Sequence, residues 1–147
     1  MFIVATASAV GYLITLAQIP VLAVQLFSGF IDKPILLLII INIFLFLMGM
    51  VMDVTPNILI FAPVLFPVIK AAGIDEYFFA LVMILNLCIG LITPPVGNVL
   101  YVGCGVAKIN FAELVKAIIP FLIVELVILL IITFVPGIVT VPLSILM

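Results

Sequence analysis

The chain has 147 residues, of which 69% are hydrophobic and only 7% are charged. A soluble domain is closer to half apolar and a quarter charged, so this composition indicates an integral membrane protein. A spanning helix needs about 20 apolar residues, which leaves room for four or five membrane segments and no sizeable aqueous domain. Lys and Arg together number four, which excludes the basic patch of a nucleic-acid binder.

The first apolar segment, residues 1–27, is predicted to form a transmembrane helix. It is apolar from Met1 onward and lacks the positively charged start of a secretory signal, as expected of a chain that begins inside a membrane segment. Ala7 and Gly11 have the small-residue spacing that lets two helices approach closely. Residues 28–34 are expected to form a loop.

Residues 35–70 are predicted to form a re-entrant helical hairpin. The second apolar run, residues 56–70, would reach only roughly 22 Å as a helix, whereas the hydrocarbon core is about 30 Å thick. The polar tip of such a hairpin has to be buried in protein or line a cavity.

Two further membrane segments are expected after a polar turn. Residues 77–107 are predicted to form a transmembrane helix that is broken near its middle, and residues 112–135 are predicted to form a final transmembrane helix. Glu125 lies in this last segment. It could act as a proton relay, face a partner subunit, or be protonated and hydrogen-bonded.

The break in the third segment is carried by the sequence GLITPPVG at residues 90–97. Pro94 and Pro95 lack the amide donors that a helix would offer to the carbonyls of Gly90 and Leu91. Together with the Thr93 hydroxyl, these carbonyls would offer oxygen ligands to a cation at membrane depth. A plain proline kink, satisfied by neighbouring helices, is the alternative.

A second break lies at the hairpin tip, in the sequence GMVMDVTPN at residues 49–57. Asp53 is an ionisable group at membrane depth, which indicates a functional site. Asp53 could equally cap the helix that Pro56 opens, and both roles can hold together. Two broken segments close in sequence are typical of the region around a transporter's binding site.

Neither break offers a nucleophile–base pair, and the sequence contains no metal-ligand cluster or phosphate loop, so nothing indicates an enzyme. The order and spacing of these motifs, with APVLFP at 62–67, GID at 73–75 and Pro120-Phe121, resemble the large membrane (M, DctM-like) subunit of tripartite ATP-independent periplasmic (TRAP) transporters. The resemblance covers nearly the whole chain and corresponds to the C-terminal part of that subunit.

The resemblance implies an all-α, elevator-type ion-transporter fold built from inverted repeats. It also implies a multi-pass protein of the bacterial inner membrane, working with a small membrane (Q) subunit, a periplasmic substrate-binding (P) protein and the remaining N-terminal half of the M subunit. Sodium would be the coupling ion, with no other cofactor.

Carried over by position, the resemblance implies a sodium site formed by Gly49, Gly90, Thr93 and Val96. It also implies a substrate region around the same two breaks, formed by Asp53, Thr55, Asn57, Pro94, Pro95, Gly97 and Asn98.

The function implied is sodium-coupled secondary transport that imports a small organic anion, such as a C4-dicarboxylate or sialic acid. The alternative is a membrane fragment or structural subunit that lacks the first inverted repeat and does not transport.

Overall fold

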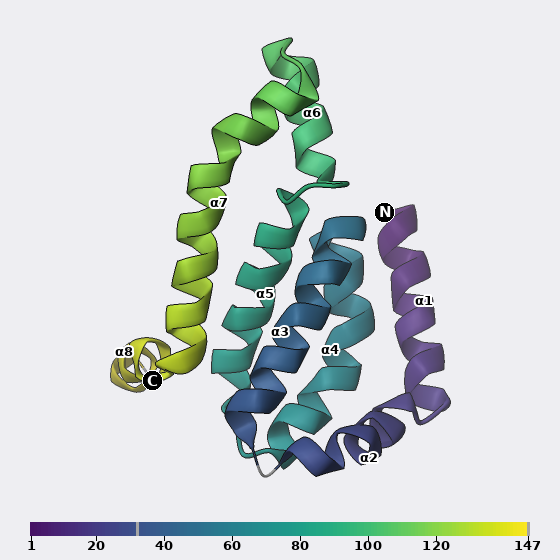
Figure 1. Cartoon of the computed structure of the whole chain (residues 1–147). Coiled ribbons are helices and arrows are strands. Elements are labelled where there is room, and N and C mark those ends of the chain that lie inside the picture. The colour runs from purple at the N-terminus through teal and green to yellow at the C-terminus, as the bar shows by residue number, and fades with distance from the viewer. Residues whose placement is uncertain (32, 147) are drawn as a thin grey trace.

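The computed structural model describes residues 1–31 and 33–146, with side chains described up to residue 142. Asp32 therefore lies outside the described residues. All the regular secondary structure of the described residues is helical, as the sequence predicts, and these residues form no strand (Figure 1). Its helices are α1 (Phe2–Leu16), α2 (Ile19–Ile31), α3 (Pro34–Val51), α4 (Val54–Ala71), α5 (Glu76–Leu91), α6 (Asn98–Ala107), α7 (Phe111–Phe134) and α8 (Gly137–Leu146).

The segment expected to be one helix over residues 1–27 is two helices. α1 and α2 meet at an angle of 67°, and Gln18 between them has a left-handed φ of 55°. Pro20 explains the break, because its ring would clash with the carbonyl of Leu16 in a continuous helix. α2 then continues to Ile31, so most of the loop expected over residues 28–34 is helical.

α1 packs along α4 through its two small residues. Ala7 and Gly11 are the buried residues of α1, and a Cβ on Gly11 would lie 2.9 Å from the carbonyl oxygen of Leu59. This contact confirms the close packing that their spacing predicts. α2 lies across the end of the same hairpin and also contacts α4 (Figure 1).

α3 and α4 form the predicted helical hairpin, with Met52 and Asp53 between them. α4 begins at Val54 and has 18 residues, as many as α3. The prediction from its apolar run, residues 56–70, therefore made this helix too short. The two helices are each long and apolar enough to cross a membrane, as is α7, and the bent pair α1–α2 would make a fourth span. Length alone therefore does not make the hairpin re-entrant.

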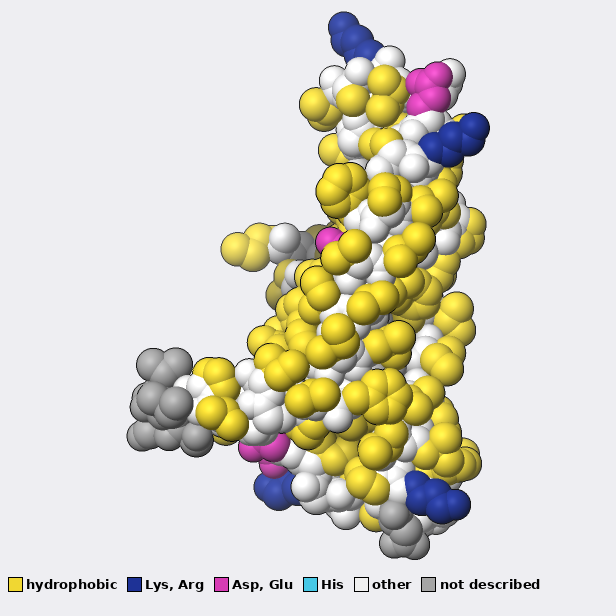
Figure 2. All heavy atoms as spheres, turned by 60° about the vertical axis from the view of Figure 1, so that its left-hand side comes forward, with side chains coloured by type: hydrophobic (Ala, Val, Ile, Leu, Met, Phe, Trp, Pro, Cys, Tyr) yellow, Lys and Arg dark blue, Asp and Glu magenta, His cyan; other side chains and the backbone are white. Residues whose placement is uncertain are grey.

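The height of the hairpin relative to the neighbouring helices bears on the re-entrant topology, which stays a prediction. Its tip lies level with the end of α5, while α6 continues beyond it before α7 returns along the bundle (Figure 1). α6 has 10 residues, which adds roughly 15 Å beyond that level. On the face shown in Figure 2, most charged side chains gather at the two ends of the molecule, one acidic side chain lies between them, and hydrophobic side chains cover most of the length.

The turn between α4 and α5 is specified locally. Gly73, with φ of 70°, ends α4. Asp75 caps α5 by accepting a hydrogen bond from the Phe78 amide at 2.8 Å. An exposed ion pair between Lys70 and Glu76, 3.2 Å long, spans the same turn and adds little stability.

The core lies between α3 and α5, which run in parallel and make the most extensive helix pair (Figure 1). Near their C-terminal ends the backbones touch at two glycines. A Cβ on Gly90 would lie 2.8 Å from the Cα of Gly49 and 2.9 Å from the Phe46 carbonyl oxygen. Only glycine fits there, because the atoms it would meet belong to the backbone.

Replacing Gly90 with alanine should destabilise the protein, because α3 and α5 would have to separate to admit the methyl group. Overpacking of this kind costs about 1–3 kcal/mol. Gly105→Ala is the matched control, since a Cβ on that helical glycine would meet nothing within 4 Å. Thermal unfolding of the purified protein in detergent measures both, and equal melting temperatures for the two variants would contradict the contact.

The broken helix and the hairpin together predict a topology that labelling can check. Single cysteines at Lys33 and Lys70 should react with an impermeant maleimide from one face of the membrane, and a cysteine at Lys108 from the other. A cysteine at Thr55, at the hairpin tip, should react much more slowly than one at Lys108 because a re-entrant tip does not reach the aqueous phase.

The native Cys88 and Cys104 would be replaced with serine beforehand, so that only the introduced thiol reacts. Two full spans in place of the re-entrant hairpin would carry the tip to the face of residue 108, and Thr55 and Lys108 would then label at equal rates.

Candidate functional site

The two breaks predicted from the sequence lie side by side in the structure. The hairpin tip follows the end of α3, the break of residues 92–97 follows the end of α5, and the two helices arrive in parallel (Figure 1). The Gly49–Gly90 contact holds the ends together. Two of the four residues predicted to bind sodium are therefore in direct contact, although they are 41 positions apart.

A hydrogen bond between side chains also joins the breaks. Asn98, the first residue of α6, donates through Nδ2 to Oδ1 of Asp53 at 3.1 Å. Asp53 occupies the N-cap position of α4, as one reading of the sequence proposed, but its side chain makes no capping bond. Its carboxylate is instead exposed and directed to the second break.

The backbone of the second break is partly satisfied by a tight turn. The Gly90 carbonyl oxygen accepts a hydrogen bond from the Thr93 amide at 3.0 Å, so the expectation that the prolines leave this carbonyl unpaired is wrong. A carbonyl oxygen has two lone pairs, so Gly90 can still offer one to a ligand. The half-buried Thr93 hydroxyl donates to the Ile89 carbonyl at 2.6 Å and also keeps acceptor capacity.

The remaining residues of this break shape the turn into α6. The Pro94–Pro95 bond is cis, Pro95 is exposed, and Val96 is half-buried. Gly97 is the N-cap of α6 with φ of 49°, and a Cβ there would lie 2.8 Å from Leu100 Cδ1. The left-handed φ favours glycine at this position, and any other residue would also require the Leu100 side chain to move.

The hairpin tip contributes two more predicted residues, with different surroundings. Thr55 is exposed in the first turn of α4. Asn57 is fully buried and donates through Nδ2 to the carbonyls of Met48 and Met52, at 3.3 and 3.1 Å. It thereby satisfies carbonyls at the end of α3, which indicates a structural role at the tip. Its Oδ1 is buried and has no partner among the described residues.

The helix ends give this region a divided electrostatic character. α3 and α5 present their C-terminal ends, which carry partial negative charge, and α4 and α6 begin beside them with N-terminal ends of partial positive charge. A cation is favoured at the first pair of ends and an anion at the second. These four helix ends can therefore accommodate a cation and an anion close together, at one level along the bundle.

Sequence reasoning missed a chain of polar contacts lower in the bundle. Asn42 on α3, Asn86 on α5 and Thr133 on α7 are joined by hydrogen bonds between their side chains. The sequence does indicate that these residues matter, because polar side chains are rare within apolar membrane helices and need partners there. It does not indicate which of them pair, since the pairing depends on the register of helices that are distant in sequence.

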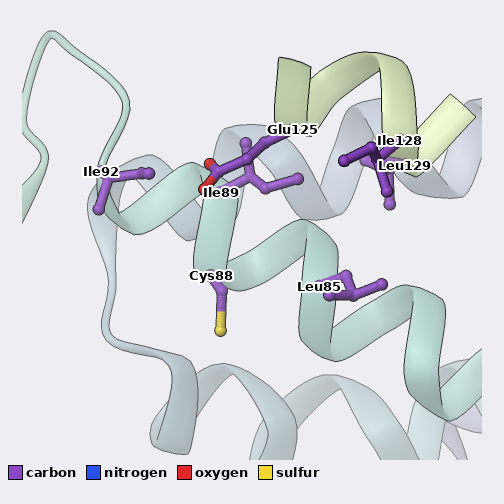
Figure 3. A pocket seen from close by; sticks show the side chains of 7 residues that line it. All are labelled: Leu85, Cys88, Ile89, Ile92, Glu125, Ile128 and Leu129. Atoms are coloured by element: carbon purple, nitrogen blue, oxygen red, sulfur yellow. The ribbon is translucent and has the colours of Figure 1, made fainter. Parts of the chain in front are cut away.

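Glu125 faces a pocket of about 400 Å³ between α5 and α7 (Figure 3). The other residues that line it are Leu85, Cys88, Ile89, Ile92, Ile128 and Leu129. Glu125 extends from α7 toward Ile89, and its Oε2 is buried without a partner among the described residues. The structure leaves the role of Glu125 open among the three alternatives that the sequence offers.

Comparisons with known proteins identify the family of this chain. The family described as "Tripartite ATP-independent periplasmic transporter, DctM component" matches residues 1–138. A Haemophilus influenzae protein named as a TRAP transporter large permease is 50% identical over 144 residues, which cover 98% of this chain and 36% of that protein.

Two further relatives carry substrate names. The 2,3-diketo-L-gulonate TRAP transporter large permease protein of Escherichia coli is 44% identical over 98% of this chain and 34% of its own length. The C4-dicarboxylate TRAP transporter large permease protein of Vibrio cholerae is 37% identical over 95% of this chain and 31% of its own length. The chain spans about a third of the length of these relatives. It is a multi-pass membrane protein that belongs to the DctM component family of tripartite ATP-independent periplasmic transporters.

Proposed function

We propose that this chain forms part of a sodium-coupled secondary transporter that imports a small organic anion. The observation that carries the proposal is the meeting of two backbone breaks at one depth, joined by the Gly49–Gly90 contact and by the Asp53–Asn98 hydrogen bond. Broken helices that meet near the membrane midplane are the usual way for secondary transporters to build ion and substrate sites.

Sodium would bind at the C-terminal ends of α3 and α5. The proposed ligands are the carbonyls of Gly49, Gly90 and Val96 together with the Thr93 hydroxyl. This donor set suits a hard cation, since it consists of neutral oxygens in a region where helix ends add partial negative charge. The second lone pair of the Gly90 carbonyl and the free acceptor capacity of Thr93 are compatible with such binding.

The anion would bind at the N-terminal ends of α4 and α6, through backbone amides. The described side chains around the breaks include no lysine, and the four basic residues of the chain are all lysines in other places. Helix N-termini can hold a carboxylate without a basic side chain. Both substrates named for the Escherichia coli and Vibrio cholerae relatives are carboxylates, which supports this substrate class.

Asp53 suggests how the two binding events are coupled. Its carboxylate lies beside both breaks and would repel an incoming anion while it attracts a cation. Bound sodium would offset that charge, so the anion would bind well only after sodium. The substrate would be delivered by a periplasmic binding protein, and a small membrane subunit would complete the complex in the bacterial inner membrane.

The Thr93 hydroxyl provides the sharpest test of the sodium site. In an assembled transporter that carries this chain, Thr93→Val removes the oxygen and preserves the shape of the side chain. The sodium concentration for half-maximal uptake should rise about tenfold, which corresponds to about 1.4 kcal/mol. Thr93→Ser keeps the oxygen and should stay near the wild type. Uptake of a labelled C4-dicarboxylate into proteoliposomes, at a series of sodium concentrations, measures both.

Thr6→Val is the matched control, because Thr6 lies on α1 and, among the described residues, its hydroxyl is hydrogen-bonded to the carbonyls of Phe2 and Ile3 in the same helix. An unchanged sodium dependence in Thr93→Val would remove Thr93 from the site. If potassium supports wild-type uptake as well as sodium does, the coupling ion itself is wrong.

A further inference from the structure

The polar residues inside the apolar helices form one connected chain. Asn86 on α5 donates from Nδ2 to both the backbone oxygen and the Oδ1 of Asn42 on α3, each at 2.8 Å. Asn42 donates in turn from its own Nδ2 to Thr133 Oγ1 on α7 at 3.1 Å. Thr133 closes the chain by donating to the Leu129 carbonyl at 2.7 Å.

Packing alone does not account for these amides. Asn86 is fully buried, and Thr133 is 3% exposed. Asn86 Oδ1 is buried and lacks a partner among the described residues, which is costly in an apolar interior. Apolar side chains in place of Asn42 and Asn86 would bury the same surface without the cost of an unpaired polar atom. The pair is therefore better explained by the geometry that it imposes on α3 and α5.

The pair lies just below the proposed ion site on the same helix interface. Asn42 precedes Gly49 by about two helical turns, and Asn86 precedes Gly90 by about one. The Gly49–Gly90 contact brings the backbones close but has no directional bond of its own. The two bonds from Asn86 to Asn42 are directional and oppose both sliding and rotation of α5 against α3.

We propose that Asn42 and Asn86 are positioning residues that set the register of α3 and α5, and thereby align the carbonyl-bearing ends of both helices for sodium. This role rests on the proposed function. Neither residue touches the ion. Thr133 extends the same control to α7, because its hydroxyl accepts from Asn42 and anchors that amide from the opposite side.

The test is a double-mutant cycle in the assembled transporter, with Asn42→Leu, Asn86→Leu and the double variant. Asn42→Leu leaves Asn86 with only the residue-42 backbone carbonyl as acceptor, and Asn86→Leu leaves Asn42 Oδ1 without its donor, so the melting temperature in detergent should fall. Each should also raise the sodium concentration for half-maximal uptake about threefold, the factor of an average hydrogen bond between membrane helices. In the double variant the melting temperature should recover, but the half-saturating sodium concentration should stay raised.

Asn110→Ala is the matched control, since Asn110 is exposed at the start of α7 and makes no capping bond. If the double variant recovers sodium affinity together with the melting temperature, the Asn42–Asn86 pair contributes only to packing, and the proposal is overturned. Single variants with wild-type sodium affinity would overturn it too.

The melting temperatures separate this failure from that of the function. If wild-type uptake does not depend on sodium, the proposed function and the positioning role both fall. The loss and recovery of the melting temperature across the cycle would then still report the Asn42–Asn86 bond itself, because that measurement is made without sodium.

Discussion

A backbone in lipid has to satisfy its own polar groups, and the rest of this structure depends on how the chain meets that requirement at two breaks. Both breaks lie at one depth, where four helix ends meet. Part of the demand is met internally, by the Thr93 amide on Gly90 and by Asn57 on the end of α3. The unused acceptor capacity of these ends is what the proposed sodium site would use.

The sequence predicted well those features whose cause is local. Pro94 and Pro95 cannot continue a helix, so the break over residues 92–97 followed from their chemistry alone. The spacing of the small residues Ala7 and Gly11 likewise predicted a close helix contact but did not indicate that α4 is the partner. Pro20 carried the same kind of signal and was overlooked within a uniformly apolar run, which is why the bend between α1 and α2 was missed.

Features that depend on register could not be predicted in the same way. The Asn42–Asn86 pair joins residues 44 positions apart and requires α3 and α5 to run in parallel at one particular offset. The Asp53–Asn98 hydrogen bond also depends on the register of the helices, although the sequence predicted that the two breaks lie close together. The satisfied Gly90 carbonyl shows a further limit, because a missing donor at Pro94 was replaced by the preceding amide in a tighter turn.

The bend between α1 and α2 has a mechanical consequence for the hairpin. α1 runs along α4, with Gly11 against Leu59, while α2 crosses the opposite end of the same helix. α4 is therefore contacted along its length by α1 and across its base by α2. A displacement of the hairpin along its axis toward α2 would have to move that crossing helix, whereas it would slide along α1.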